Sequence, residues 1–410
     1  MTTGIKTAKP EAIPADALPL VKSGRGYTML DGIRIVDLTT SIAGPSATML
    51  LADMGAEVLK IERPNGGDDA RAWGPPFLDG EALWFASVNR NKKSVALDYS
   101  SPEGLEILHR LMKTADMVVV NVSPRVARKL KIDVATLRAL REDLIYVSIT
   151  GFGIDGERAD WTCYDLIAEG YSGIMDVTGE AGREAQKVGA PAADMLAGQD
   201  AAFGAIAALF DRQRTGKGHV VDVALVDSMT RFLSCRIMPY LGSGTVPTRS
   251  GGRDSVIAIY QAFETADDPI TLGLGNDNLW QRFWDAVGKP DQASMDGRRS
   301  NIERRENRDD IVAEIASILR EKPRSHWLPL FAAARVPAGP INRVDQVVAD
   351  ETLHRRGLFY RMTADDGRIV PQVGTGFVID GTPNVPRCAP PRLGEHTDDI
   401  LRELNSSSTQ

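Results

Sequence analysis

Residues 33–62 read IRIVDLTTSIAGPSATMLLADMGAEVLKIE, and this stretch decides the fold. The apolar, β-branched run at 33–39 predicts a strand. The small-residue segment at 41–55 predicts a loop and a helix that ends at Gly55, and 56–62 predicts a second strand. A strand, a helix and a strand in this order form a right-handed unit with parallel strands. The stretch therefore predicts an α/β fold.

The same alternation continues along the chain. Further strands are expected at 94–99, 116–122 and 144–153, helices at 102–115 and 126–143, and another strand and helix at 218–233. Near-continuous apolar strands separated by helices indicate a parallel sheet that is covered on both faces. We expect a doubly wound large domain with its ligand site at the carboxyl ends of the strands.

Composition changes near residue 240, where LGSGTVPTRSGGRD (241–254) predicts a linker or a ligand loop. A hairpin that turns at 267–269 and helices at 278–287, 301–321 and 325–335 follow. We therefore expect a smaller α+β domain at 240–340. The large domain would span 29–239 and 341–410, preceded by a loose N-terminal arm at 1–28.

The overall composition limits the class of protein. The chain has 410 residues, of which 43% are hydrophobic and 25% charged, with a formal net charge of −7. An acidic chain argues against general nucleic-acid binding, and no apolar run is long enough to cross a membrane. Three cysteines without a C-x-x-C pair and five histidines without ligand spacing predict no metal site and a cytoplasmic location.

The turn after the first strand, TTSIAGPS, lacks two common nucleotide motifs. It is not the G-x-G-x-x-G fingerprint of nicotinamide dehydrogenases, and no G-x-x-x-x-G-K-[ST] phosphate loop occurs. A dehydrogenase is therefore disfavoured, although the strand and helix pattern alone allows one.

One acid stands among small apolar residues in VGAPAADMLAGQDAAFGAIAALF, residues 188–210. Asp194 lies where this segment turns into a helix, and the ordinary interpretation is a helix cap. A second interpretation is a nucleophile that the helix dipole and backbone N–H groups keep ionised. The local sequence leaves both open.

Five strings in order along the chain carry a family resemblance: GIRIVDLT, NRNKKSVALD, GYSGIMDVTG, TGKGHVVDVALVDSM and VPAGPI. They resemble the family III CoA-transferases, such as the formyl-CoA and crotonobetainyl-CoA transferases. The resemblance runs from about Asp31 to LGEHTDDIL near the C-terminus. It implies a Rossmann-like large domain, a small domain joined by two linkers, and two subunits interlocked as rings in a homodimer.

The resemblance also implies a nucleophile. The family places an aspartate in a short loop before a helix, and Asp194 matches that position. Of the acids nearby, Asp200 falls inside the helix, Asp176 precedes VTG, and Asp165 is expected to cap or pair structurally. The implied chemistry moves CoA from an acyl-CoA to a carboxylic acid through an aspartyl-CoA thioester, with no permanently bound cofactor.

Coenzyme A is thus the implied substrate, and the family positions map onto several residues here. Arg63 and Lys129 would face its charged part and Asn121 would end the fourth strand beside it. The full expected set is Ile42, Ala43, Arg63, Leu97, Tyr99, Ser100, Asn121, Val122, Ser123, Lys129 and Tyr164. Gly251 and Gly252 resemble a glycine-rich loop that covers the site, but a plain flexible turn fits them equally.

Two positions depart from the family pattern and leave alternatives open. Ile42 replaces a glutamine, which favours a larger or less polar acid than formate or oxalate, and Thr162 replaces a basic residue. Related 2-methylacyl-CoA racemases need a histidine where Tyr164 stands, and tyrosine is a poor proton carrier at neutral pH. A racemase is therefore the less favoured alternative, and a non-catalytic CoA-binding subunit is another.

Overall fold

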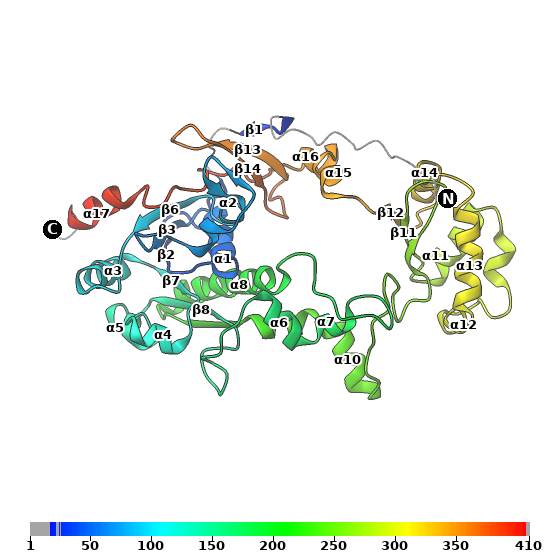
Figure 1. The fold of residues 1–410 in the computed structure, drawn as a ribbon, viewed down its shortest axis with the longest axis horizontal. Helices are drawn as coiled ribbons and strands as arrows, with labels where there is room; N and C mark the ends of the chain where they lie inside the picture. The colour runs from blue at the N-terminus through cyan, green and yellow to red at the C-terminus, as the bar shows by residue number, and fades with distance from the viewer. Residues whose placement is uncertain (1–16, 22–23, 25, 407–410) are drawn as a thin grey trace. The chain divides into compact units, whose positions relative to one another are not determined.

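A six-stranded parallel sheet forms the centre of the larger part of the chain in the computed structural model, which describes residues 17–21, 24 and 26–406. The strands lie in the order β6-β3-β2-β7-β8-β9. They are β2 (Arg34–Asp37), β3 (Glu57–Glu62), β6 (Lys92–Ala96), β7 (Met117–Val120), β8 (Ile145–Thr150) and β9 (Val220–Ala224). Numbered along the chain, this is the 3-2-1-4-5-6 order of the doubly wound Rossmann fold. The predicted α/β class with a parallel sheet is confirmed, and the strand order reverses between β2 and β7 (Figure 1).

Helices cover both faces of this sheet. On one face α3 (Pro102–Thr114), α5 (Val134–Leu140) and α17 (Thr397–Ser406) contribute Leu108, Leu137 and Leu404 to a buried core. On the other face α1 (Ala43–Asp53) and α8 (Ala192–Thr215) pack together (Figure 1). Their contact is close because it uses small residues: a Cβ built on Gly198 would lie 2.1 Å from Oγ of Ser46.

The single helix expected at 126–143 is wrong, since the chain forms α4 (Pro124–Lys129) and then α5. Lys131 between them has a φ of 55°, which no helix continues through. Asp133 then caps α5, because its Oδ1 accepts the N–H of Thr136 at 3.2 Å.

A second, three-stranded sheet joins an early segment of the chain to residues 359–373. In it β1 (Leu20–Val21) pairs with β13 (Phe359–Thr363), which pairs with β14 (Ile369–Val373). The loose arm expected at 1–28 falls partly outside the described residues (1–16, 22–23 and 25), and its described part is not loose. Tyr27, in particular, is buried and its N–H donates to Oδ1 of Asn384 at 3.1 Å.

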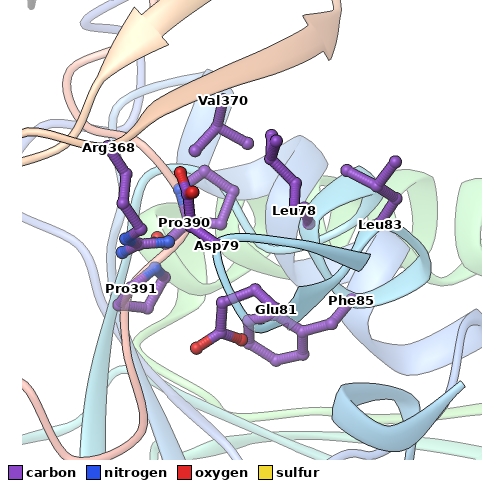
Figure 2. Close-up of a pocket in the computed structure, with 10 residues that line it drawn as sticks. Leu78, Asp79, Glu81, Leu83, Phe85, Arg368, Val370, Pro390 and Pro391 are labelled. Atoms are coloured by element: carbon purple, nitrogen blue, oxygen red, sulfur yellow. The ribbon is translucent and has the colours of Figure 1, made fainter. Parts of the chain in front are cut away.

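The returning C-terminal segment also packs on a small hairpin, β4 (Phe77–Leu78) and β5 (Glu81–Ala82). Figure 2 shows Arg368, Pro390 and Pro391 together with Glu81 and Phe85, which line one pocket. The pocket has a volume of about 10 Å³. That volume holds about one water molecule. None of the predicted site residues lines it, so this pocket belongs to the packing of the chain end.

The chain divides into two units, and each is described by itself. The large unit comprises the described residues of Met1–Ile174, Lys187–Leu241 and Val348–Gln410, and the small unit comprises Met175–Gln186 and Gly242–Val347. The small unit thus includes 175–186, which the sequence alone assigns to the large domain. The remaining elements of the large unit and of the connections are η2 (Asp69–Ala72), α2 (Leu83–Ser87), α6 (Asp165–Ser172), α7 (Ile174–Val177), α9 (Leu225–Phe232), α10 (Ser234–Ser243), α15 (Val344–Val348) and α16 (Glu351–Arg355).

The small unit is α+β. Its antiparallel sheet contains β10 (Tyr260–Phe263), β11 (Ile270–Gly273) and β12 (Ala338–Pro340), so the predicted hairpin is present. The helices are α11 (Asp277–Ala286), η3 (Pro290–Ser294), α12 (Asn301–Glu306), α13 (Arg308–Leu319) and α14 (Arg324–Ala333). Trp280, Phe283, Trp284 and Phe331 fill its core with edge-on and tilted ring contacts. Within the described residues, no helix of either unit is long and apolar enough to cross a membrane.

Candidate active site

A cavity of about 200 Å³ lies at the carboxyl ends of β2, β7 and β8, within the large unit. Open parallel sheets place their ligands at this edge, where the strand order reverses. The residues that line it are Thr40, Ser41, Ala43, Asp69, Asn121, Ile149, Thr150, Gly151, Thr162, Cys163, Tyr164, Asp194 and Leu225. Three expected CoA-binding residues, Ala43, Asn121 and Tyr164, therefore lie beside Asp194.

Asn121 fixes the turn after β2. Its Oδ1 accepts the N–H of Thr40 at 3.1 Å, and its Nδ2 donates to the carbonyl of Thr40 at 2.8 Å. The next residue, Ser41, has a φ of 71°, and its N–H donates to Oδ1 of Asp68 at 2.9 Å. Side chains on both sides of the turn thus hold a backbone conformation that non-glycine residues rarely adopt.

A buried network of ion pairs and hydrogen bonds also supports the turn after β2. Lys60, whose side chain is fully buried, pairs with Asp68 at 2.8 Å and donates to the carbonyl of Thr39 at 2.9 Å. Lys92 pairs with Asp37 at 3.1 Å, also fully buried. Burial alone would favour the neutral acid, but the ammonium groups of Lys92 and Lys60 hold the pKa of Asp37 well below its usual range. The sequence analysis missed these residues; the available signal was Lys60 inside the apolar strand predicted at 56–62, whereas Lys92 precedes the strand predicted at 94–99.

Asp194 is the third residue of α8, and its carboxylate is not a helix cap. The cap is supplied by Asp165, whose Oδ1 accepts the N–H groups of Ala193 at 2.8 Å and of Asp194 at 3.3 Å. The carboxylate of Asp194 accepts no hydrogen bond from the described residues. The ordinary interpretation of Asp194 is therefore wrong, and the structural role expected for Asp165 is present.

The electrostatics of Asp194 also differ from the expectation of a carboxylate kept ionised. Burial, with a smaller contribution from the charge of Asp165, raises the pKa of Asp194 to about 7. The reason is that the helix N–H groups point at Asp165, so nothing compensates the burial of Asp194. Near neutral pH the group is poised between its two protonation states.

The acids that compete with Asp194 are paired elsewhere. Asp200 pairs with Arg231 at 2.6 Å, and Asp176, in the small unit, pairs with Arg249 at 2.9 Å. Asp69, which also lines the cavity, pairs with Arg63 at 2.5 Å. Asp194 is thus the acid in this cavity without an ion pair or a hydrogen bond to its carboxylate among the described residues.

The other expected CoA-binding residues divide into three groups. Tyr99, Ser100 and Lys129 line a second cavity of about 610 Å³ that also exposes His109 and Lys113. Arg63 lies at the end of β3 and reaches the first cavity through Asp69. Ile42, Leu97, Val122 and Ser123 do not line either cavity, and Ile42 and Leu97 are buried.

The two glycines of the expected covering loop belong to the small unit. Gly251 and Gly252 line a cavity of about 820 Å³ beside β10, β11 and β12. Gly251 has a φ of +63°, and its N–H donates to the carbonyl of Gly179 at 2.9 Å. That N–H is therefore occupied within the small unit.

No group of three or more histidine, cysteine or acidic residues that could hold a metal ion occurs in the part of the chain that the structure describes. The cavity around Asp194 contains one thiol, Cys163, which the sequence analysis did not single out. Burial, helped by the charge of Asp194, raises the pKa of Cys163 to about 11.

The sheet order and the cavity at its reversal point define a Rossmann-like α/β protein with a ligand site at the carboxyl edge of the sheet. The chain belongs to CoA-transferase family III, whose model matches residues 30–397. The family predicted from the sequence is confirmed, and so is the class of enzyme, a CoA-transferase.

Named relatives cover nearly the whole chain. The succinate–glutarate CoA-transferase of Agrobacterium fabrum is 38% identical over 92% of this chain and 96% of its own length. The succinyl-CoA:mesaconate CoA-transferase of Haloarcula marismortui is 35% identical over 91% of this chain and 96% of its own. The crystal structure of a CAIB/BAIF family protein from Brucella suis is 37% identical, with a TM-score of 0.81 over 92% of this chain and all of that one.

Proposed function

We propose that this enzyme moves CoA from an acyl-CoA donor to a carboxylic acid through an aspartyl-CoA thioester on Asp194. One observation carries the proposal: the carboxylate of Asp194 opens into the cavity at the sheet edge, while Asp69, Asp165 and Asp200 are held by other groups. A carboxylate nucleophile needs free lone pairs, and Asp194 has them.

The steps balance without a further reactant. A carboxylate oxygen of Asp194 attacks the thioester carbonyl of the donor, and the C–S bond breaks to give a mixed anhydride and CoA thiolate. The thiolate attacks the aspartyl carbon of the anhydride, which leaves the aspartyl-CoA thioester and the free donor acid. The acceptor carboxylate then attacks that thioester, and the same two steps run in reverse to release the new acyl-CoA and Asp194.

The side chains at the sheet edge support this substrate. The phosphates of CoA need local cations on this acidic chain, and the second cavity presents Lys129 and Lys113 beside Tyr99 and Ser100. We propose that this cavity takes the phosphate-bearing part of CoA, and that Ala43, Asn121 and Tyr164 flank its thioester end. Charge-assisted bonds from lysine suit phosphate oxygens. The residues Ile42, Leu97, Val122 and Ser123 remain predictions from the family resemblance.

We also propose a homodimer. The large unit exposes several big apolar side chains on α8 and α9, among them Phe203 at 77%, Phe210 at 63% and Phe232 at 53%. Exposed apolar residues gathered on neighbouring helices are typical of an interaction surface. The interlocked arrangement, the cytoplasmic location and the lack of a permanent cofactor stay predictions.

The experiment that tests the function is peptide mass spectrometry after incubation with acyl-CoAs and then hydroxylamine. We expect a hydroxamate on the peptide that contains Asp194, its loss in Asp194→Asn, and its retention in Asp200→Asn. A racemase would instead show no adduct and would exchange deuterium into the α-position of a 2-methylacyl-CoA. A binding subunit would show neither result. The racemase is disfavoured because no histidine is among the described residues that line the cavity.

A further inference from the structure

The turn that leads into α8 is held at both ends by acids from one helix. Asp165 and Glu169 are four residues apart on α6, so their side chains share one face of that helix. Asp165 accepts the N–H groups of Ala193 and Asp194, while Oε2 of Glu169 accepts the N–H of Val188 at 2.7 Å. The two acids therefore hydrogen-bond the backbone at both ends of the turn 188–194.

Glu169 is buried and makes no ion pair among the described residues. Its relative exposure is 0%, and its second oxygen, Oε1, is buried with no hydrogen-bond donor among the described residues. Burying an ionised carboxylate costs free energy when one of its oxygens has no hydrogen-bond donor. The charged groups that face it are Asp165 on its own helix, which disfavours ionisation, and Lys187, which favours it. The ammonium of Lys187 donates instead to the carbonyl of Val188 at 2.9 Å.

The chemistry of this pair requires a proton. Two ionised carboxylates cannot bond to each other because neither has a donor, whereas one proton between them makes a short, strong bond. The side chains of Asp165 and Glu169 project from the same face of α6, one turn apart. Burial raises the pKa of Glu169 above its usual value, and the charge on Asp165 adds a smaller contribution in the same direction.

We propose that Glu169 is a positioning residue for Asp194, which keeps a proton on Oε1, donates it to the carboxylate of Asp165, and so fixes the turn that aims Asp194 into the cavity. The inference rests on the proposed function of Asp194. Glu169 does not touch the cavity itself, since it is absent from the residues that line it. Its effect therefore passes through Asp165 and through the backbone from Val188 to Asp194.

The test compares Glu169→Gln with Glu169→Ala, measured as the rate of hydroxamate formation on Asp194 across pH. Glutamine keeps a carbonyl oxygen for the N–H of Val188 and an amide donor for Asp165, as the protonated acid does. We expect the glutamine variant to keep the wild-type rate and pH profile. Alanine should slow adduct formation about 10- to 100-fold, because a small displacement of a reacting group costs that much, with the KM for acyl-CoA unchanged.

The pH profile separates a positioning role from a merely structural one. In Glu169→Ala the loosened turn admits water to Asp194, so the midpoint of the profile should move to lower pH. Asp200→Asn removes an acid from α8 that pairs with Arg231 and should leave rate and profile unchanged. Should the glutamine variant be as slow as the alanine variant, the proton on Glu169 is disproved. An alanine variant with wild-type rate and profile would overturn the positioning role.

Failure of the proposed function can be told apart from failure of this inference. If the wild-type enzyme forms no hydroxamate with any acyl-CoA, the proposed nucleophile is wrong and the role of Glu169 falls with it, whereas failure of the Glu169 inference alone leaves wild-type adduct formation intact. If Glu169→Ala does not fold, the glutamine variant still decides, because an ionised Glu169 predicts that its neutral analogue alters the profile.

Discussion

The side-chain amide of Asn121 hydrogen-bonds both backbone groups of Thr40, across the point where the strand order of the sheet reverses. This pair ties the end of β7 to the turn after β2, and both residues line the cavity that contains Asp194. The amide of Asn121 therefore holds this turn from one side, while Asp68 and Lys60 hold it from the other.

Asn121→Ala should unfold more easily and bind acyl-CoA less well. The substitution leaves the N–H and carbonyl of Thr40 without partners, which costs about 1–3 kcal/mol when such groups are not fully hydrated. Urea unfolding measures the loss of stability, and initial rates measure the rise in KM. For stability, Ser123→Ala is the matched control, because Ser123 makes no capping bond to α4 and its truncation should cost less than about 0.5 kcal/mol. Equal stability of the two variants would contradict the prediction.

Asp194→Asn should abolish adduct formation and yet stabilise the protein at alkaline pH. A pKa of about 7 means that the folded state holds this proton more tightly than the unfolded chain. The contribution of Asp194 to stability therefore falls as the pH rises from about 4 through 7. The variant should exceed the wild type by on the order of 1–4 kcal/mol at pH 8 and by much less at pH 5. Urea unfolding at both values tests this, and a gap that does not widen with pH would refute it.

Adduct formation in the wild type should increase with pH and level off above about 7, since only the carboxylate of Asp194 attacks a thioester. Asp165→Asn should shift that midpoint downward but not to the usual aspartate value, because burial is the larger cause of the shift and the charge of Asp165 the smaller. Asparagine keeps an oxygen for the N–H groups of α8. Single-turnover rates between pH 5 and 9 measure both midpoints, and an unmoved midpoint would show that the charge of Asp165 plays no part.

Gly198→Ala should destabilise the chain even though alanine favours helix. A Cβ at 198 would lie 2.1 Å from Oγ of Ser46 and 2.8 Å from the carbonyl of Ala43, so α1 and α8 must separate. Overpacking of this kind costs about 1–3 kcal/mol. Thermal unfolding of Gly198→Ala, with Ser46→Ala added to remove the nearer clash, should show partial recovery. In Gly204→Ala the new Cβ would contact a methyl of Val221, a side chain that can rotate. This substitution should therefore reduce stability less than Gly198→Ala.

Much of the large unit could be predicted from the sequence because the spacing of apolar residues in each segment is typical of a strand or of a helix. The apolar runs at 33–39 and in the later strand segments predicted the parallel sheet. The turn residues at 267–269 predicted the hairpin of β10 and β11. The break between α4 and α5 could not be predicted, because the apolar spacing continues through 130–133. The helix breaks there because Lys131 has a positive φ and Asp133 caps the next helix.

The site shows the same division between local and distant causes. Asp194 could be singled out by family position, but its protonation could not, since that depends first on burial and then on Asp165, which lies 29 residues earlier and occupies the helix N–H groups. The buried lysines are a similar case. Lys60 and Lys92 become neighbours of Asp68 and Asp37 only when β2, β3 and β6 pair, and no local pattern reports that.

The cysteine in the cavity has a consequence for chemical selectivity. A thiol attacks an acyl group only as thiolate, and a pKa of about 11 leaves Cys163 almost wholly protonated at neutral pH. In the proposed mechanism, an acyl group activated on Asp194 therefore meets a sulfur atom that does not compete with coenzyme A for it. Burial, the larger cause of this shift, thus keeps a side reaction, self-acylation of the protein, out of reach even when Asp194 is acylated and uncharged.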